Sequence, residues 1–342
     1  RLFASYLWTS SSSAAAQRHA AWFASRLAER HPPASHPRLV ELASNDGLLL
    51  RHLAGQGYAV RGVEPSNLAD EASAEGLPTV RAFFEAGVAR ALAERDGPAD
   101  VVVARNVLGH VADLRGFLEG VALLLRPGGV FVVESPYGQR LREGLQYDYV
   151  FHEHVSYFTV TTLARALTRY GLAPVHLGFV DLNGGSFLCE AWRTDPAAPG
   201  PALDAVLELE RVCELNEAEG WSWYPAAVDQ QKRQLRGLLQ WLVRESAAVV
   251  GYGAAARTMT MFNACGIGTD LLGAIADGNP RKQGLLCPGS RIPVVSPEQV
   301  LARDPDCVLI GPWNFAHEIA GQLRERGYEG RLAVGLPVPR VL

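Results

Sequence analysis

Short apolar runs alternate with longer amphipathic stretches along the first 195 residues. The longer stretches have apolar residues near helical spacing and predict helices at 48–56, 67–75 and 117–125. The short apolar runs predict strands at 39–42, 58–64, 100–104, 130–134 and 189–193. Strands that alternate with helices in this way predict an α/β fold, with a parallel sheet covered on both faces.

The same alternation returns in the last hundred residues. Apolar runs predict strands at 247–250, 272–276, 307–310 and 332–334, with a turn at 251–256 and a helix at 315–326. A linker rich in proline and alanine at 196–201 and two helical stretches, 202–219 and 226–245, separate the two patterns. At the start of the chain, Ser13 can cap a helix over 14–30. We therefore predict four parts: an N-terminal segment 1–35, an α/β domain 36–195, a helical linker 196–245 and a second Rossmann-like domain 246–342.

Composition narrows the class of protein. The 342 residues are 48% hydrophobic and 20% charged, which indicates a globular core and excludes a disordered chain. A net charge of −4 argues against a nucleic-acid partner. No apolar run approaches the ~20 residues of a membrane span, and no signal peptide is visible. Five dispersed cysteines without a CxxC pair favour a reducing cytoplasm. We expect a cytoplasmic protein with a small-molecule partner, and the oligomeric state stays open.

The turn after the first strand is the first candidate site. It reads Glu41-Leu42-Ala43-Ser44-Asn45-Asp46-Gly47, and Glu64 ends the next strand. Ligands of open α/β sheets bind at the carboxyl ends of strands, and an acid there accepts hydrogen bonds from ribose hydroxyls. The GxGxxG pattern of a pyrophosphate loop is absent, so an adenosine ligand without phosphates, most commonly S-adenosylmethionine, fits better. The alternative is a plain turn with a surface glutamate.

Two histidines flank an acid in Phe151-His152-Glu153-His154. Imidazole titrates near neutrality, so a general base is reasonable. A metal site is disfavoured, because positions 152 and 154 of an extended segment point to opposite sides and no third ligand is evident. The alternative is a solvated loop. His110 follows the third strand and lies at the carboxyl edge, where a ligand would sit.

The loop Gly251-Tyr252-Gly253 followed by three alanines is an incomplete dinucleotide loop. Small residues let the backbone approach a phosphate, and a helix N-terminus favours anions. Arg257 can pair with a phosphate oxygen. The alternative is a tight strand-to-helix turn that needs glycine.

Together these segments resemble the sugar C-methyltransferases of deoxysugar biosynthesis, which act on dTDP-linked 4-keto sugars, typically at C3, in secondary-metabolite and antibiotic pathways. The resemblance covers essentially the whole chain and keeps the motif order. It is carried by Glu41–Gly47, Val63–Ser66, Asn106–His110, His152–Phe158, Asn183–Ser186, Val250–Arg257 and Cys265–Gly268. It implies a Rossmann-like class I methyltransferase domain that uses S-adenosylmethionine, followed by a second Rossmann-like domain.

The resemblance also implies roles for residues. His154 would be the base that removes the proton alpha to the ketone, and Glu153 and His110 would orient it or stabilise the enolate. Residues expected to hold the cofactor are Tyr6, Glu41, Ala43, Asn45, Asp46, Gly47, Glu64, Pro65 and Asn106. Residues expected to hold the substrate are Tyr149, Tyr157, Asn183, Gly251, Tyr252, Gly253 and Arg257, with the Gly251–Arg257 loop near the diphosphate.

Two departures from the family pattern matter. Members usually carry an N-terminal zinc domain with paired cysteines, so we expect this chain to be truncated or variant there and name no metal ligand. Phe151 stands where the family often has tyrosine, a hydroxyl that Tyr149 or Tyr157 would have to replace. The alternatives are an O- or N-methyltransferase, a methyltransferase of polyketide or carrier-bound substrates, a nicotinamide-dependent oxidoreductase and a non-catalytic binding module.

Overall fold

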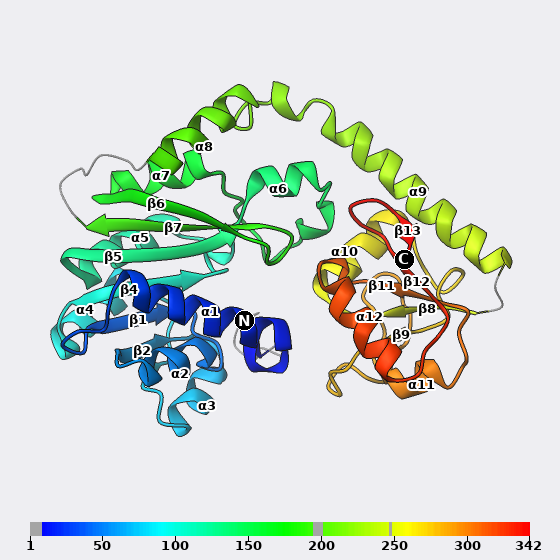
Figure 1. Cartoon of the computed structure of the whole chain (residues 1–342), viewed down its shortest axis with the longest axis horizontal. Coiled ribbons are helices and arrows are strands. Elements are labelled where there is room, and N and C mark those ends of the chain that lie inside the picture. The colour runs from blue at the N-terminus through cyan, green and yellow to red at the C-terminus, as the bar shows by residue number, and fades with distance from the viewer. Residues whose placement is uncertain (1–8, 194–200, 246–247) are drawn as a thin grey trace. The chain divides into compact units, whose positions relative to one another are not determined.

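The computed structural model describes residues 9–193, 201–245 and 248–342. Tyr6, an expected cofactor residue, lies outside these ranges. The described chain forms two compact α/β units (Figure 1). The first comprises Arg1–Tyr137, Val155–Val180 and Ser186–Val212, and the second comprises Gly138–His154, Asp181–Gly185 and Cys213–Leu342.

The first unit is built on a seven-stranded sheet with the order β3-β2-β1-β4-β5-β7-β6. Its strands are β1 Arg38–Leu42, β2 Ala59–Val63, β3 Thr79–Val80, β4 Ala99–Arg105, β5 Leu125–Pro136, β6 Leu172–Val180 and β7 Ser186–Arg193. Its helices are α1 Ala14–Arg30, α2 Leu48–Gly55, α3 Leu68–Ala74, α4 Ala86–Asp96, α5 Leu114–Leu124, α7 Val160–Arg169 and α8 Pro201–Val212. The first five strands are parallel, whereas β7 pairs antiparallel with both β5 and β6.

The central strands of this sheet are apolar because both of their faces are buried. Val102 and Phe131, on neighbouring strands, have no exposed surface. Helix α1 packs Phe23 and Leu27 against one face of this sheet, in a core that contains Val103 and Val132. As expected, Ser13 caps α1, accepting a hydrogen bond from the Ala16 N–H at 3.3 Å.

The second unit has a six-stranded sheet with the order β10-β9-β8-β11-β12-β13. Its strands are β8 Val249–Tyr252, β9 Ile275–Ala276, β10 Val294–Val295, β11 Cys307–Ile310, β12 Arg331–Val334 and β13 Arg340–Val341. Its helices are α6 Gly138–Glu143, α9 Tyr224–Glu245, α10 Ala256–Cys265, α11 Pro297–Leu301 and α12 Ala316–Glu325. Helix α9, yellow-green in Figure 1, buries Leu235, Leu239 and Leu242 in this core.

Apart from β6, the two sheets have the same strand order. In the first, β2 and β3 lie on one side of β1, β4 and β5 lie on the other, and the antiparallel β7 pairs with β5. In the second, β9 and β10 lie on one side of β8, β11 and β12 lie on the other, and the antiparallel β13 pairs with β12. The order therefore reverses at β1/β4 in the first unit and at β8/β11 in the second. Ligands of open α/β sheets bind at such switch points, at the carboxyl ends of the strands.

Several sequence predictions are confirmed and others are wrong. The α/β pattern and helices α1, α9 and α12 are confirmed within a few residues. The expected strand 272–276 forms only over its last two residues, because Leu271 and Leu272 turn back to the Gly268 carbonyl. Strand β8 extends through Tyr252, so Gly251 belongs to the strand and not to the turn. The stretch 202–219 is helical only to Val212. Helices α4 and α7 and strand β6 were not predicted.

The compact units also differ from the expected domains. Gly138–His154 and Asp181–Gly185, which the sequence grouped with the first domain, belong to the second unit. The physical reason is a set of buried polar contacts that they make there, including Asp148 with Arg257 and the Tyr147 hydroxyl with Gln231. No helix in the described ranges is long and apolar enough to cross a membrane.

Candidate active site

The loop between β1 and α2 turns sharply at the carboxyl edge of the first sheet. Ala43, Asn45 and Gly47 all adopt positive φ, with values of 54°, 51° and 74°. A Cβ at Gly47 would lie 2.5 Å from the Leu77 Cδ1 atom, so glycine is required there. Ala43 and Asn45 are non-glycine residues in a left-handed conformation, and this form of backbone strain is common in ligand-binding loops.

Glu64 follows β2 directly and is tied to this loop. One carboxylate oxygen accepts the Asn45 N–H at 2.9 Å, and the other accepts the Ser66 N–H at 2.9 Å. The side chain is buried. Each carboxylate oxygen can accept a further hydrogen bond, so Glu64 can still receive ribose hydroxyls. Pro65 lies in the same turn.

Several buried polar atoms beside these strands have no hydrogen-bond partner. They are Glu41 Oε2, Ser44 Oγ, Arg105 Nε and Asn106 Oδ1. The other oxygen of Glu41 accepts from Arg105 Nη2 at 3.0 Å. Burial raises the pKa of Glu41 to about 7, although Arg105 opposes this. Buried acceptors without donors are costly, and a ligand that donates to them relieves that cost.

A buried carboxylate that sequence reasoning missed fixes Asn106. Glu134, near the end of β5, has no exposed surface and accepts from Asn106 Nδ2 at 3.0 Å. The Asn106 N–H donates to the Glu134 carbonyl at 2.8 Å, and Asn106 has a φ of 54°. His19 of α1 approaches the other Glu134 oxygen at 2.6 Å. A glutamate after the apolar run 130–133 was the available signal, as it was for Glu64.

The serine run near the N-terminus contacts the loop 43–47. The Ser10 N–H donates to Asn45 Oδ1 and the Ser11 N–H to Asp46 Oδ2, both at 2.9 Å. The Ser11 hydroxyl also donates to Asp46. The run therefore does more than lead into α1, because it holds two of the polar side chains of the loop, Asn45 and Asp46.

His110 closes the 3₁₀ turn Leu108–His110 after β4 and is half-buried. The neighbouring Gly109 carbonyl accepts the Val155 and Ser156 N–H groups at 2.8 and 3.2 Å. Tyr157, an expected substrate residue, is 41% exposed in this unit. The first unit thus brings His110 to the carboxyl edge of its sheet, as expected.

His154 lies in the second unit, in a turn and not in an extended segment. Its Nδ1 atom is 2.8 Å from the Tyr149 carbonyl oxygen. A carbonyl only accepts, so Nδ1 carries the proton and the neutral ring keeps its lone pair on Nε2. The rings of Tyr149 and Phe151 each lie 4.1 Å from the His154 ring. Glu153, beside His154, is half-buried.

Arg257 is held by acceptors within the second unit. Nε and Nη2 donate to the two oxygens of Asp148 at 2.7 and 2.9 Å. Nη2 also donates to Gln146, and Nη1 donates to the Asn183 carbonyl at 2.8 Å. Four of its five N–H groups thus have protein acceptors, and a diphosphate would compete with Asp148 for them.

The Gly251–Arg257 loop repeats the pattern of the first unit. Gly253 has a φ of 88°, and a Cβ there would lie 2.4 Å from Pro312 Cδ. Asp277, directly after β9, accepts the Ala254 N–H at 2.9 Å and the Asn279 N–H at 2.8 Å. Glu64 makes the same two kinds of contact. It accepts the N–H of Asn45, in the loop after β1, and the N–H of Ser66, two residues further along the chain. Sequence reasoning missed Asp277, although it too ends an apolar run.

Family models match both parts of the chain. Residues 14–177 match a methyltransferase domain, and residues 181–338 match a C-methyltransferase C-terminal domain. The C-methyltransferase NovU of Streptomyces niveus is 34% identical over 349 residues, covering all of this chain and 82% of NovU. The chain belongs to this C-methyltransferase family. It is a C-methyltransferase that uses S-adenosylmethionine.

Two further similarities each cover only part of the chain. A ubiquinone biosynthesis O-methyltransferase of Caulobacter sp. is 37% identical over 103 residues, which are 29% of this chain and 40% of that enzyme. The structure of magnesium protoporphyrin IX methyltransferase from Synechocystis, solved with bound S-adenosylmethionine, shares 16% identity at a TM-score of 0.39. That match covers 52% of this chain and 79% of the other.

The buried atoms of the first unit fit the cofactor of the C-methyltransferase. S-adenosylmethionine carries an ammonium group, and Glu41 Oε2 and Asn106 Oδ1 are acceptors that lack a donor. Its ribose hydroxyls match the lone pairs that remain on Glu64. We expect these three residues to hold the cofactor, with the strained loop 43–47 beside them.

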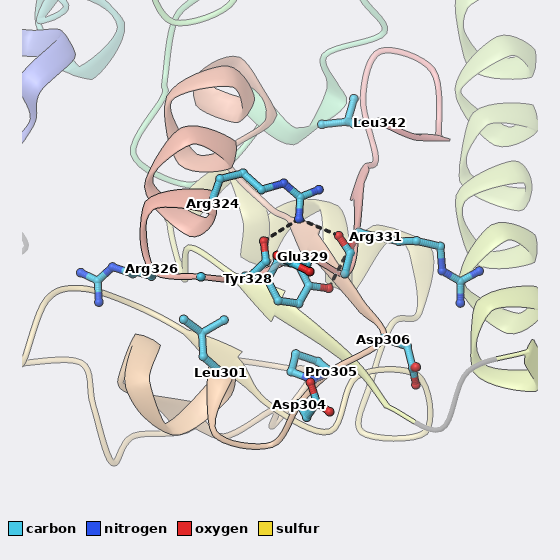
Figure 2. Close-up of a pocket in the computed structure, with 12 residues that line it drawn as sticks. Leu301, Asp304, Pro305, Asp306, Arg324, Arg326, Tyr328, Glu329, Arg331 and Leu342 are labelled. Atoms are coloured by element: carbon cyan, nitrogen blue, oxygen red, sulfur yellow. Dashed lines mark hydrogen bonds between the residues drawn. The ribbon is translucent and has the colours of Figure 1, made fainter.

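A surface hollow of about 680 Å³ lies elsewhere in the second unit. Asp306, Arg331 and neighbouring residues line it at the amino ends of β11 and β12, which is the edge opposite Gly253 (Figure 2). Figure 2 shows Arg324 donating to the Tyr328 and Gly330 carbonyls, at 2.6 and 3.0 Å. No residue expected in the active site lines this hollow.

Cofactor binding to the C-methyltransferase at pH 6 is expected to release up to about one proton. Glu41, with a pKa of about 7, is mostly protonated there, and a nearby ammonium favours its ionised form. Calorimetric titration with S-adenosylmethionine in buffers of different ionisation enthalpy measures the release. Glu41→Gln should abolish this proton release. In the native protein the release should vanish at pH 8.5. Equal release by the two proteins at pH 6 would refute the assignment.

Proposed function

We propose that this C-methyltransferase methylates C3 of a dTDP-linked 4-keto deoxysugar, with His154 as the base. The observation that carries the proposal is the hydrogen bond from His154 Nδ1 to the Tyr149 carbonyl. In the neutral ring this hydrogen bond places the lone pair on Nε2, the atom that we propose accepts the proton. Imidazole is suited to this step because it titrates near the operating pH.

The chemistry needs more than a base. A C–H bond next to a ketone is acidic only when the enolate is stabilised, which requires a donor to its oxygen. His110 and Glu153 are proposed for that role or for orienting the base. S-adenosylmethionine supplies an electrophilic methyl group on its sulfonium sulfur. Glu41, Glu64 and Asn106 bind the cofactor, and alignment is then the protein's main contribution to the rate.

The second unit supports a nucleotide-linked substrate. Asp277 and the Gly253 loop repeat the hydrogen-bond pattern of Glu64 and the loop 43–47, at the corresponding place in a sheet of the same strand order. An acid at this place in a Rossmann-like sheet accepts ribose hydroxyls. We propose that Asp277 receives the sugar hydroxyl of the nucleoside.

Calorimetric titration with dTDP, with S-adenosylhomocysteine present, tests this. Saturable one-site binding is expected, and Asp277→Asn should weaken it about 10-fold or more, because hydrogen bonds to a charged group contribute about 1.5–3 kcal/mol. Asp304→Asn, at the opposite edge of the sheet, is the matched control and should bind normally. If native protein binds S-adenosylhomocysteine but not dTDP, the substrate is not a nucleotide sugar, and a polyketide or carrier-bound substrate takes its place.

A further inference from the structure

We propose that Arg257 is a positioning residue for the base: it fixes His154 through Asp148 and Tyr149. The inference rests on the proposed role of His154. It assigns Arg257 a different task from the phosphate contact that the sequence suggested. All of the contacts that carry it lie within the second unit.

Five side chains are linked by successive ring and cation–π contacts, in the order Trp313, Arg257, Tyr149, His154, Phe151, and the Tyr149 and Phe151 rings also meet edge-on at 6.2 Å. The Arg257 guanidinium carbon lies 5.0 Å from both the Trp313 and the Tyr149 ring centres. The Tyr149 and Phe151 rings each lie 4.1 Å from the His154 ring. Arg257 thus contacts the ring of Tyr149, and that ring packs against His154.

The same arginine also fixes the backbone that holds His154. Its bidentate pair with Asp148 anchors the 3₁₀ turn Tyr147–Tyr149, and Asp148 is 1% exposed. Asp148 accepts a further hydrogen bond from Trp313 Nε1 at 3.0 Å. The next residue, Tyr149, provides the carbonyl that binds His154 Nδ1. The planar fork of arginine suits both the carboxylate and the two rings, and lysine cannot reproduce it.

Arg257→Ala should therefore impair the base and spare ligand binding. We expect kcat to fall about 10²-fold, the loss typical of a misplaced catalytic group. The dissociation constants of S-adenosylhomocysteine and dTDP should stay within about threefold of native. Guanidinium ion should restore at least about a tenth of native activity, whereas methylammonium of equal charge should not. Arg326→Ala, which removes a surface arginine paired with Glu298, is the matched control and should leave kcat unchanged.

Two results would overturn the proposal. If Arg257→Ala loses dTDP affinity but keeps kcat, Arg257 is a phosphate ligand. If guanidinium and methylammonium rescue equally, the arginine supplies only charge. Arg257→Lys serves where the alanine variant does not fold, and it should also lose kcat despite its positive charge.

A spectroscopic readout separates this inference from the proposed function. In protein with ¹⁵N-labelled histidine, the His154 signal, identified by its loss in His154→Gln, should show the Nδ1–H tautomer. In Arg257→Ala that preference should be lost, and an unchanged spectrum contradicts the inference. The measurement needs no substrate, so it decides the role of Arg257 even if native protein fails to methylate a keto sugar.

Discussion

Replacing His154 with glutamine is expected to lower kcat by ~10²-fold or more, the usual contribution of a general base. Glutamine keeps a donor toward the Tyr149 carbonyl but has no titratable lone pair in place of Nε2. Binding of S-adenosylhomocysteine should be unchanged, because the residues proposed to hold the cofactor lie in the first unit. Initial rates of methyl transfer to a dTDP-4-keto deoxysugar measure the effect. Exchange of the alpha proton with deuterated water should fall in parallel.

His152→Gln is the matched control, since His152 is an exposed histidine of the same turn. It should retain kcat within about twofold. A His154→Gln enzyme that works at nearly the native rate would refute the assignment of the base. Loss of turnover with normal proton exchange would instead show that His154 acts after deprotonation.

The parts of the fold that the sequence predicted well are those with strong local signals. The central strands are continuous apolar runs, and α1 and α9 are long and periodic. The longer elements α4, α7 and β6 were missed as well, but several errors fall on short elements. Strand β9 has only two residues, and β13 is held by two antiparallel pairs. Elements of this size are formed by pairing with neighbours and carry almost no periodicity of their own.

The cofactor side of the site was predictable because its residues follow strand ends in sequence. Glu41 and Glu64 could be placed at one sheet edge from the alternating pattern alone. Glu134 and Asp277 carry the same signal, a carboxylate directly after an apolar run, and could have been found by it. The rule that ligands bind at carboxyl ends applies to every strand near the switch point, in both units.

The arrangement around His154 was beyond sequence reasoning. Arg257 and Asp148 are 109 positions apart, and His19 and Glu134 are 115 apart. No local pattern pairs such residues. The motif Phe151–His154 indicated a base, but the tautomer depends on which carbonyl meets Nδ1, and that depends on a turn fixed by the distant arginine. The residue types of the motif were enough to suggest a general base. The orientation and tautomer of His154 could be obtained only from the tertiary contacts.

Asp148→Ala is expected to destabilise the second unit by about 3–5 kcal/mol, the usual result of removing one partner of a buried ion pair. It leaves Arg257, 13% exposed at its side chain, without its bidentate acceptor, and it also removes the acceptor of Trp313 Nε1. Denaturant unfolding followed by tryptophan fluorescence measures the loss. Asp229→Ala, which breaks an exposed pair with Lys232, is the matched control and should leave the midpoint unchanged.

The double variant Asp148→Ala/Arg257→Met distinguishes an unpaired charge from lost packing. Removing the charge while keeping an unbranched apolar chain between Trp313 and Tyr149 should recover much of the stability, since a buried charge without a partner is the main cost. Activity should not recover, because the turn that presents the Tyr149 carbonyl would still lack its anchor. If the double variant recovers both stability and activity, neither Asp148 nor Arg257 positions His154. No recovery of stability would assign the loss to packing of the turn itself.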